Sequence, residues 1–322
     1  MRLYWPGLAV SAVVAVAASF LSLQYRASAM LFALLLGMAL HFLAEEGRCL
    51  PGIQLASSVI LRTGVALLGL RITFAQVADL GWATALIVVV TVAATILAGV
   101  ALARAMKLGS AFGTLTGGAV AICGASAALA IASILPRHPA AERDASFTVI
   151  SVTALSTLAM ILYPIVVGAL DLDHRTAGVF LGGTIHDVAQ VVGAGYSVSN
   201  ETGDTATIVK LLRVAMLLPA CLVIGLALHV RGATAAHAAP VLPWFAVAFA
   251  ALVVINSAGW IPAIVIDAGS TVSRACLVMA IAAIGMKTSL KSLVDMGLKP
   301  VMLVVLETLV LAVLVLGVLA WT

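Results

Sequence analysis

Apolar residues occur in eleven long stretches of this chain, separated by short segments that carry most of its charged side chains. The stretches lie at roughly 6–23, 29–45, 53–70, 82–105, 112–135, 145–170, 176–196, 206–229, 241–259, 268–286 and 301–321. An apolar helix of about 20 residues crosses the hydrocarbon core of a bilayer and satisfies its own backbone hydrogen bonds there. The pattern therefore predicts an all-α polytopic membrane protein with about eleven transmembrane helices.

Composition excludes the other broad classes of protein. The chain is 63% hydrophobic and 9% charged, whereas a soluble domain carries about 25% charged residues. The net charge of +4 comes without a basic cluster, so we expect no nucleic-acid partner. The four cysteines lack paired spacing, and neither a zinc motif nor a phosphate-binding loop occurs. We predict no metal, no cofactor and no enzymatic activity.

Three short stretches of the first half recur in the second half, in the same order and 145 to 151 residues later. The pairs are 36–45 with 181–190, 60–62 with 211–213, and 130–134 with 280–284. A fourth match, 69–73 with 285–289, has an offset of 216 residues, and we interpret it as a repeated way of ending a helix. A duplicated unit with ionisable residues inside its apolar segments is typical of secondary transporters.

The common offset of the first three matches predicts three parts. Residues 1–28 hold an extra N-terminal transmembrane helix, 29–170 form a first five-helix repeat, and 176–322 form a second. Because five is odd, the second repeat enters the membrane from the opposite side and is inverted. In this register His41 superposes on His186, and Arg62 superposes on Arg213.

Lysine and arginine residues in the connecting segments predict the orientation. With eleven crossings, nine of these basic residues lie on the side of the N-terminus: Arg2, Arg48, Arg104, Lys107, Arg175, Arg231, Lys287, Lys291 and Lys299. The other four lie on the opposite side: Arg26, Arg71, Arg137 and Arg143. Positively charged loops stay in the cytoplasm. The N-terminus is therefore expected in the cytoplasm and the C-terminus outside it.

Glycines cluster inside the stretch at 112–135, which predicts a helix broken near the middle of the membrane. Gly117 and Gly118 are followed by Cys123, Gly124 and Ser126. Glycine inside a helix costs about 1 kcal/mol relative to alanine, and unwound backbone at membrane depth needs protein or water around it. A break would direct half-helix N–H groups toward a bound anion. Close helix packing through small residues is the alternative reading.

A second break is expected at 269–274, where small and polar residues, among them Ser273, precede an apolar run. This segment is the repeat partner of 112–135, so we expect the two breaks to face each other near the midplane. Both would then line one anion site.

His186 and Asp187 adjoin in the middle of an apolar stretch, and Gln190 follows one turn later. Charged groups at membrane depth cost at least about 2.5 kcal/mol and are usually functional. An imidazole beside a carboxylate can carry a proton near neutral pH. We predict that these three residues bind the coupling ion, H⁺ or Na⁺.

Arg62 and Arg213 are the basic pair related by the duplication. Two guanidinium groups in one cavity would bind a doubly charged oxyanion through bidentate hydrogen bonds. Asn256 is a secondary candidate for the same site. The alternative is that the arginines pair with buried carboxylates such as Asp187 or Glu307, or reach an interface.

Four strings carry a family resemblance: 117–127, the Gly-Thr-Ile-His-Asp-Val-Ala-Gln-Val-Val-Gly-Ala-Gly string at 183–195, 210–214 and 243–245. Over essentially its whole length the chain resembles the YeiH-like sulfate exporter family of bacterial inner-membrane proteins. The resemblance implies the bile-acid-transporter-like superfold, with a panel domain, a core domain and two broken helices that cross. The chain departs from the family pattern at Asp187, where glutamate is common, and at Arg274.

These observations favour a secondary active transporter that exports a small anion, sulfate or an organosulfonate, with ion coupling. A cation/proton antiporter with its ion at His186 and Asp187 is one alternative, and a channel or non-transporting membrane receptor is another. The expected partners are the anion, H⁺ or Na⁺, and the lipid bilayer, and a homodimer remains open.

Overall fold

The computed structural model describes residues 3–25, 28–45, 47–136, 138–230, 244–288 and 297–321. Within these ranges the chain is helical with short connections and contains no strand, as the apolar pattern predicts. The helices are α1 (Trp5–Tyr25), α2 (Ala29–Ala39), α3 (Phe42–Glu45), α4 (Leu50–Leu55), the π-helical turn η1 (Ala56–Ile60), α5 (Leu61–Leu68), α6 (Phe74–Asp79), α7 (Gly81–Ala105), α8 (Ser110–Ala121), α9 (Ala125–Ile134), α10 (Ala141–Ala169), α11 (His174–Thr184), α12 (Val188–Val198), α13 (Asn200–Ala215), α14 (Leu217–Val230), α15 (Trp244–Ser257), α16 (Ala263–Lys287) and α18 (Leu298–Leu319).

Seven helical segments of the described chain are long and apolar enough to cross a membrane: α1, α4–α5, α7, α10, α13–α14, α16 and α18. Four further apolar helices are shorter, with 10–17 residues: α2, α9, α12 and α15. The chain is therefore a multi-pass membrane protein. The count of eleven crossing helices is not reproduced in these residues, because two of the expected segments fold as hairpins.

The segment expected to cross at 176–196 is one of these hairpins. α11 and α12 are separated by Ile185–Asp187. The hydroxyl of Thr202, at the start of α13, donates to the carbonyl oxygen of His174, the first residue of α11, at 3.0 Å. Because α12 ends just before α13 begins, the α11–α12 hairpin enters and leaves at one face. Its two arms, of 11 residues each, are too short to cross separately.

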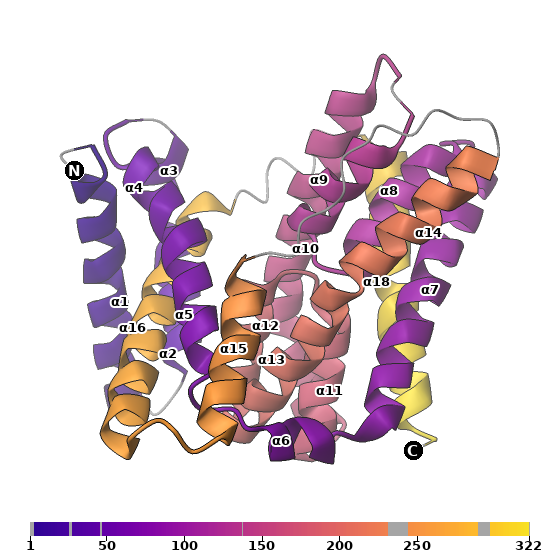
Figure 1. Ribbon diagram of the computed structural model, residues 1–322. Helices are drawn as coiled ribbons and strands as arrows, with labels where there is room; N and C mark the ends of the chain where they lie inside the picture. The colour runs from indigo at the N-terminus through magenta and orange to yellow at the C-terminus, as the bar shows by residue number, and fades with distance from the viewer. Residues whose placement is uncertain are drawn as a thin grey trace.

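The segment at 112–135 is broken as predicted, but it also turns back. α8 ends at Ala121 and α9 begins at Ala125. The rings of Phe112, in the first turn of α8, and Phe147, near the start of α10, have centroids 5.7 Å apart. α9 ends at Ile134, shortly before α10 begins at Ala141. The α8–α9 hairpin thus occupies the half of the molecule opposite to the α11–α12 hairpin, as Figure 1 shows.

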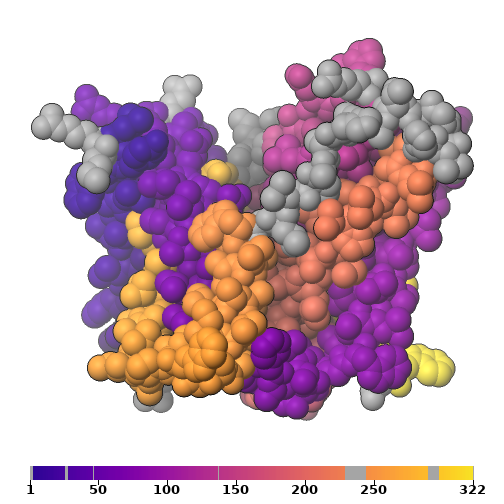
Figure 2. Space-filling view, in the orientation of Figure 1, coloured from indigo at the N-terminus to yellow at the C-terminus, as the bar shows by residue number. Residues whose placement is uncertain are grey.

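The helices form two bundles. The first bundle contains α1, α2, α4–η1–α5, α15 and α16, and the second contains α7 to α14 and α18 (Figure 1). α12 packs against α2 and α16 and so joins the two. In the space-filling view, α15 lies in front at the boundary between the bundles (Figure 2). The N- and C-terminal ends lie at opposite faces (Figure 1).

The contacts between helices indicate a repeat that differs from the one predicted by the offset of 145 to 151 residues. The contact of α2 with α16 resembles the contact of α15 with α5. In the same way, the contact of α7 with α8 resembles the contact of α18 with α11. The 216-residue offset pairs α2 with α15, α4–α5 with α16 and α7 with α18, so it corresponds to more than a recurring helix end. The hairpins would then be equivalent elements in a permuted order. The division at 29–170 and 176–322 stays a prediction.

The superposition of His41 on His186 does not agree with this packing. His41 follows α2 in the first bundle, and its Nδ1 lies 2.6 Å from the carbonyl oxygen of Met286. His186 lies at the tip of the α11–α12 hairpin in the second bundle. Similar short strings therefore mark unlike elements.

The break expected at 269–274 is wrong. α16 is a continuous helix of 25 residues. Its small residues serve close packing on α5: a Cβ at Gly269 would lie 2.3 Å from Leu70 Cδ1, and Ser273 donates to the carbonyl oxygen of Gly64 at 2.6 Å. The close-packing reading, proposed as the alternative for 112–135, applies here instead.

Local sequence signals fix the edges of these elements. The Asp173 carboxylate caps α11 by accepting hydrogen bonds from the backbone N–H groups of Arg175 and Thr176. Hydrogen bonds from Thr176 lower the pKa of this exposed carboxyl.

Within the α4–α5 span, the π-helical turn at Ala56–Ile60 interrupts the regular ladder of helical hydrogen bonds. Such turns are frequent at functional sites, and this one borders the cavity described next.

Candidate functional site

The tips of the two hairpins meet inside the second bundle. The α8–α9 tip is Ile122–Gly124, and the α11–α12 tip is Ile185–Asp187. Gly124 has φ +61, and a Cβ there would lie 2.6 Å from Oδ1 of Asp187. Glycine is therefore required at this point both for its backbone conformation and for the space it leaves.

Lys210 and Arg213 hold the two tips together. Both belong to α13 and are fully buried. The Lys210 ammonium donates to the carbonyl oxygens of Ile122 at 2.7 Å and Ile185 at 3.0 Å. These oxygens lie at the C-terminal ends of α8 and α11, where carbonyls lack helical partners and the helix dipole favours a cation.

The Arg213 guanidinium completes the same arrangement. It donates to four carbonyl oxygens, at 2.9 to 3.1 Å, on both hairpins: those of Val120, Ala121, Gly182 and Ile185. These carbonyls occupy most of its N–H groups, and Arg213 does not line the cavity. The structure therefore places Arg213 apart from Arg62, although both were expected in one anion site.

A cavity of about 480 Å³ lies between the bundles and reaches the hairpin tips. The first bundle contributes residues of η1, α5, α15 and α16, and the second contributes residues of both tips and of α9, α10 and α12. The polar lining residues are Ser57, Ser58, Arg62, Cys123, Ser126, Thr153, Asp187, Gln190, Lys287 and Thr288.

The charges of the cavity are unevenly distributed between its walls. Arg62 and Lys287 supply two cations from the first bundle, and the Lys287 ammonium donates to Ser57 Oγ at 3.3 Å. Asp187 supplies a carboxylate from the second bundle, close to the backbone N–H of Ala125 and the hydroxyl of Thr153.

Two helix N-termini also face this region. α9 and α12 both begin at the tips, with 10 and 11 residues. Their first N–H groups lack helical partners, and the positive ends of their dipoles favour negative charge. Together with the two cations, they make the cavity suited to an anion.

Five of the predicted site residues line the cavity: Arg62, Cys123, Ser126, Asp187 and Gln190. Sequence reasoning missed Lys287, Ser57, Ser58, Thr153 and Thr288. The sequence pattern places Lys287 among the loop charges, although it is the counterpart of Arg71 in the 216-residue match. The serines and threonines gave no signal, because hydroxyls are common in packed membrane helices.

The remaining predicted residues have other surroundings. Gly117 packs against α7, and Gly118 packs against Ile131. Asn256 donates to the carbonyl oxygen of Ile72 at 3.2 Å. His186 is fully buried, and its Nε2 lies 2.9 Å from the Thr308 hydroxyl. Adjacent residues at this tip therefore point to different places, with Asp187 lining the cavity and His186 meeting α18.

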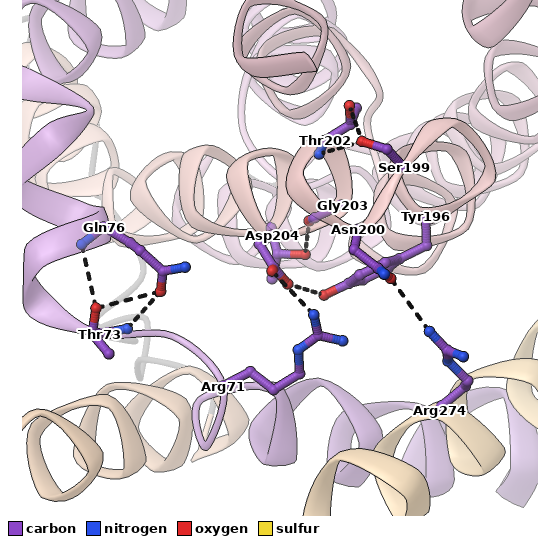
Figure 3. Close-up of polar contacts among 11 residues, drawn as sticks. Arg71, Thr73, Gln76, Tyr196, Ser199, Asn200, Thr202, Gly203, Asp204 and Arg274 are labelled. Atoms are coloured by element: carbon purple, nitrogen blue, oxygen red, sulfur yellow. Dashed lines mark hydrogen bonds and ion pairs between the residues drawn. The ribbon is translucent and has the colours of Figure 1, made fainter. Parts of the chain in front are cut away.

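A second polar cluster joins the two bundles, and Figure 3 shows its side chains. Because it includes residues of the first turns of α13, which lie beside the start of α11, it is nearer the face at which α11 begins. Arg71, just after α5, pairs with the Asp204 carboxylate of α13 at 3.3 Å, and the Tyr196 hydroxyl donates to the same carboxylate. Arg274 of α16 donates to the side-chain oxygen of Asn200 at 3.3 Å. We refer to these five residues as the interbundle cluster.

Comparison with known proteins identifies close relatives. A family model described as "Conserved hypothetical protein 698" matches residues 6–304. A UPF0324 membrane protein of Chlorobaculum tepidum is 56% identical over 321 residues, 99% of this chain and 90% of the relative. The UPF0324 membrane protein TauZ of Paracoccus pantotrophus is 54% identical over 315 residues, 97% of this chain and 93% of the relative. No solved structure matches the chain significantly.

Proposed function

The chain belongs to the UPF0324 family of membrane proteins, and we propose that it is a secondary active transporter that exports a small anion, sulfate or an organosulfonate. The observation that carries the proposal is the cavity at the hairpin tips. Arg62, Lys287 and the N-termini of α9 and α12 converge there on a space of about 480 Å³. A tetrahedral anion needs charge-assisted donors of this kind.

The position of the cavity between the bundles supports a transport cycle. One wall belongs to the first bundle and the other to the hairpin tips, while the interbundle cluster joins the same bundles nearer one face. In the proposed cycle the second bundle moves against the first, so that the cluster opens and the anion is exposed to the other side. Alternating access by one bundle moving against another is common in transporters with repeats.

The orientation in the proposal rests on the basic residues. Because each hairpin returns to the face from which it enters, Arg143 lies at the N-terminal face. Arg175, which contacts the carbonyl oxygen of Asp79, lies at the other face. The described basic residues at the N-terminal face are Arg48, Arg104, Lys107, Arg143 and Lys299, and those toward the other face are Arg71, Arg175 and Arg274. Lys287 lines the cavity and is not counted. Arg2, Arg26, Arg137, Arg231 and Lys291 lie outside the described residues. The excess supports a cytoplasmic N-terminus and a periplasmic C-terminus in the bacterial inner membrane.

A ligand screen tests the proposal at the level of binding. The melting temperature of the purified protein is measured with sulfate, organosulfonates, chloride and carboxylates at several pH values. A ligand that binds the folded state raises this temperature. We expect the largest rise with a sulfur oxyanion, and stabilisation by Na⁺ or H⁺ alone would favour the cation/proton antiporter.

Asp187 is the proposed site of the coupling ion, with Gln190 beside it on the cavity wall. Replacing Asp187 by asparagine is expected to abolish the pH or Na⁺ dependence of anion flux in proteoliposomes, because the neutral amide cannot exchange a proton or balance a cation. The protein should still fold. Asp267→Asn, at an exposed position of α16, is the matched control. Normal flux with an unchanged ion dependence would place the coupling ion elsewhere.

Asp204 offers a test of the moving bundles. Asp204→Asn removes the charge that pairs with Arg71, so the face at which α11 begins should open more often. We expect Ser197→Cys to react several-fold faster with an impermeant maleimide from that face in the Asp204→Asn background. The exposed Asp171→Asn is the control. An unchanged rate would show that the cluster does not close the pathway.

A further inference from the structure

Glu307 is a buried carboxyl group outside the cavity, in the middle of α18. Its side chain is fully buried, and its Oε1 lies 2.7 Å from the Thr116 hydroxyl of α8. Its Oε2 has no hydrogen-bond partner. Among the described residues, no lysine, arginine or histidine nitrogen lies within ion-pair distance of it.

The Thr116 hydroxyl has one hydrogen but two neighbours that accept. It lies 3.1 Å from the carbonyl oxygen of Phe112 as well as 2.7 Å from Glu307 Oε1. An ionised Glu307 would compete with Phe112 for that hydrogen. A protonated Glu307 removes the conflict, because its O–H donates to the Thr116 oxygen while Thr116 donates to Phe112.

The energetics agree with this stereochemistry. An unpaired carboxylate in an apolar interior is far more costly than a neutral acid with one hydrogen bond. The site is also shaped for the group: a Cβ at Gly99 of α7 would lie 2.6 Å from Oε1, and Gly113 and Gly117 of α8 pack against the same part of α7. The Thr95 hydroxyl, one turn before Gly99, is buried without a partner.

The residue after Glu307 connects this site to the other hairpin. Thr308 meets His186 at the α11–α12 tip, with 2.9 Å between the hydroxyl and Nε2, while Glu307 meets the α8–α9 hairpin through Thr116. Two consecutive residues of α18 thus hold both hairpins. A change in the charge of Glu307 would alter how α18 contacts the elements that line the cavity.

We propose that Glu307 is a proton-binding site of the transport cycle, occupied in this conformation and emptied when the α8–α9 hairpin moves. The proposal rests on the transporter function proposed above and adds to Asp187 a second ionisable site, remote from the anion. Proton release requires that the carboxylate reach water or a cation, which its glycine-lined site between α7 and α8 denies it here.

Other titratable groups around α18 do not take this role. The helices packed on α18 carry their charged residues near their ends: Arg104 on α7, Glu142, Arg143 and Asp144 on α10, and His174 and Arg175 on α11; Lys299 is in the first turn of α18 itself. α8 carries none. Tyr163 of α10 packs on the ring of Phe180. His186 is linked to α18 by its contact with Thr308, the residue that follows Glu307.

Infrared difference spectroscopy of the full-length protein in liposomes tests the protonation directly. A carboxylic acid C=O band should be present at neutral pH, disappear in Glu307→Gln and shift in Thr116→Val. Glu142→Gln, the same change at an exposed position, should leave the band in place. A C=O band of the same position and intensity in Glu307→Gln as in the wild type would show that the Glu307 carboxyl is ionised and would overturn the proposal, whether or not the protein transports an anion.

The second arm measures ³⁵S-sulfate flux and sulfate stabilisation of the same variants. Glu307→Gln should lose at least tenfold of pH-gradient-driven flux and keep the sulfate-induced rise in melting temperature, because the anion site is separate. Full pH-driven flux in Glu307→Gln would overturn the role in the cycle and leave the anion transporter intact. Absence of sulfate or organosulfonate binding by the wild type would instead overturn the proposed function.

Discussion

Replacing Arg213 by glutamine is expected to lower the free energy of unfolding by about 3 kcal/mol or more, the largest loss of stability among the substitutions considered. The change removes charged hydrogen bonds, each worth about 1.5–3 kcal/mol, and leaves buried carbonyls without partners. Four carbonyl oxygens on two hairpins accept hydrogen bonds from this one group, and only that of Ile185 also accepts one from Lys210. Thermal unfolding of the detergent-solubilised protein measures the effect.

The control for this prediction is Arg143→Gln, whose side chain is 85% exposed and should change stability by no more than about 0.5 kcal/mol. Arg213→Lys should fall between the two, because an ammonium keeps the charge but not the fork of donors. If Arg213→Gln kept the stability of the wild type but lost anion binding, Arg213 would be a ligand of the anion, as the sequence predicts.

Replacing Arg62 and Lys287 together by glutamine is expected to weaken anion binding about a hundredfold. Each cation contributes a charge-assisted contact, and every 1.4 kcal/mol lost is about a tenfold change in affinity. Neither side chain supports the fold in the way that Arg213 does, so the melting temperature without ligand should stay close to that of the wild type. Titration of the ligand-induced shift in melting temperature gives the affinities.

Arg48→Gln and Lys299→Gln are the matched controls, because both positions are exposed and neither lines the cavity. If the double variant at Arg62 and Lys287 bound the anion as the wild type does, the cavity between the bundles would not be the anion site.

The membrane class, the helices and the family were predictable from the sequence. Apolar stretches fixed the places of the helices because a span needs about 20 apolar residues. The family resemblance, drawn from strings such as Gly-Thr-Ile-His-Asp-Val, agrees with the close relatives. The glycines at 117–124 indicated the first break, and Gly124 with φ +61 lies at its tip.

The hairpins were not predictable in the same way. Two apolar arms of 10 to 12 residues joined by a short turn have the same length and hydropathy as a single span, so 112–135 and 176–196 read as crossings. The turn at Ile185–Asp187 contains no glycine. The Ile185 carbonyl oxygen at its start accepts hydrogen bonds from Lys210 and Arg213, which come from another helix. Such a long-range arrangement leaves no local pattern in the sequence.

The chemistry of the site was partly visible for a related reason. Arg62, Asp187 and Gln190 stood out because polar groups inside apolar stretches are rare, and they line the cavity. The same rarity drew attention to Arg213 and Glu307, but it could not distinguish a group that meets a ligand from one that meets backbone or a neighbouring hydroxyl. That distinction depends on which helices pack together.

Counterflow in proteoliposomes tests the central claim most directly. Vesicles containing the purified protein are loaded with unlabelled sulfate or taurine and diluted into a trace of the ³⁵S-labelled compound, without any ion gradient. We predict that the label accumulates transiently and saturably for at least one of the two, and that Arg62→Gln with Lys287→Gln abolishes the accumulation while Arg48→Gln with Lys299→Gln does not. Labelled anion that enters no faster than in protein-free vesicles, or that enters without saturation as through a channel, would contradict the account.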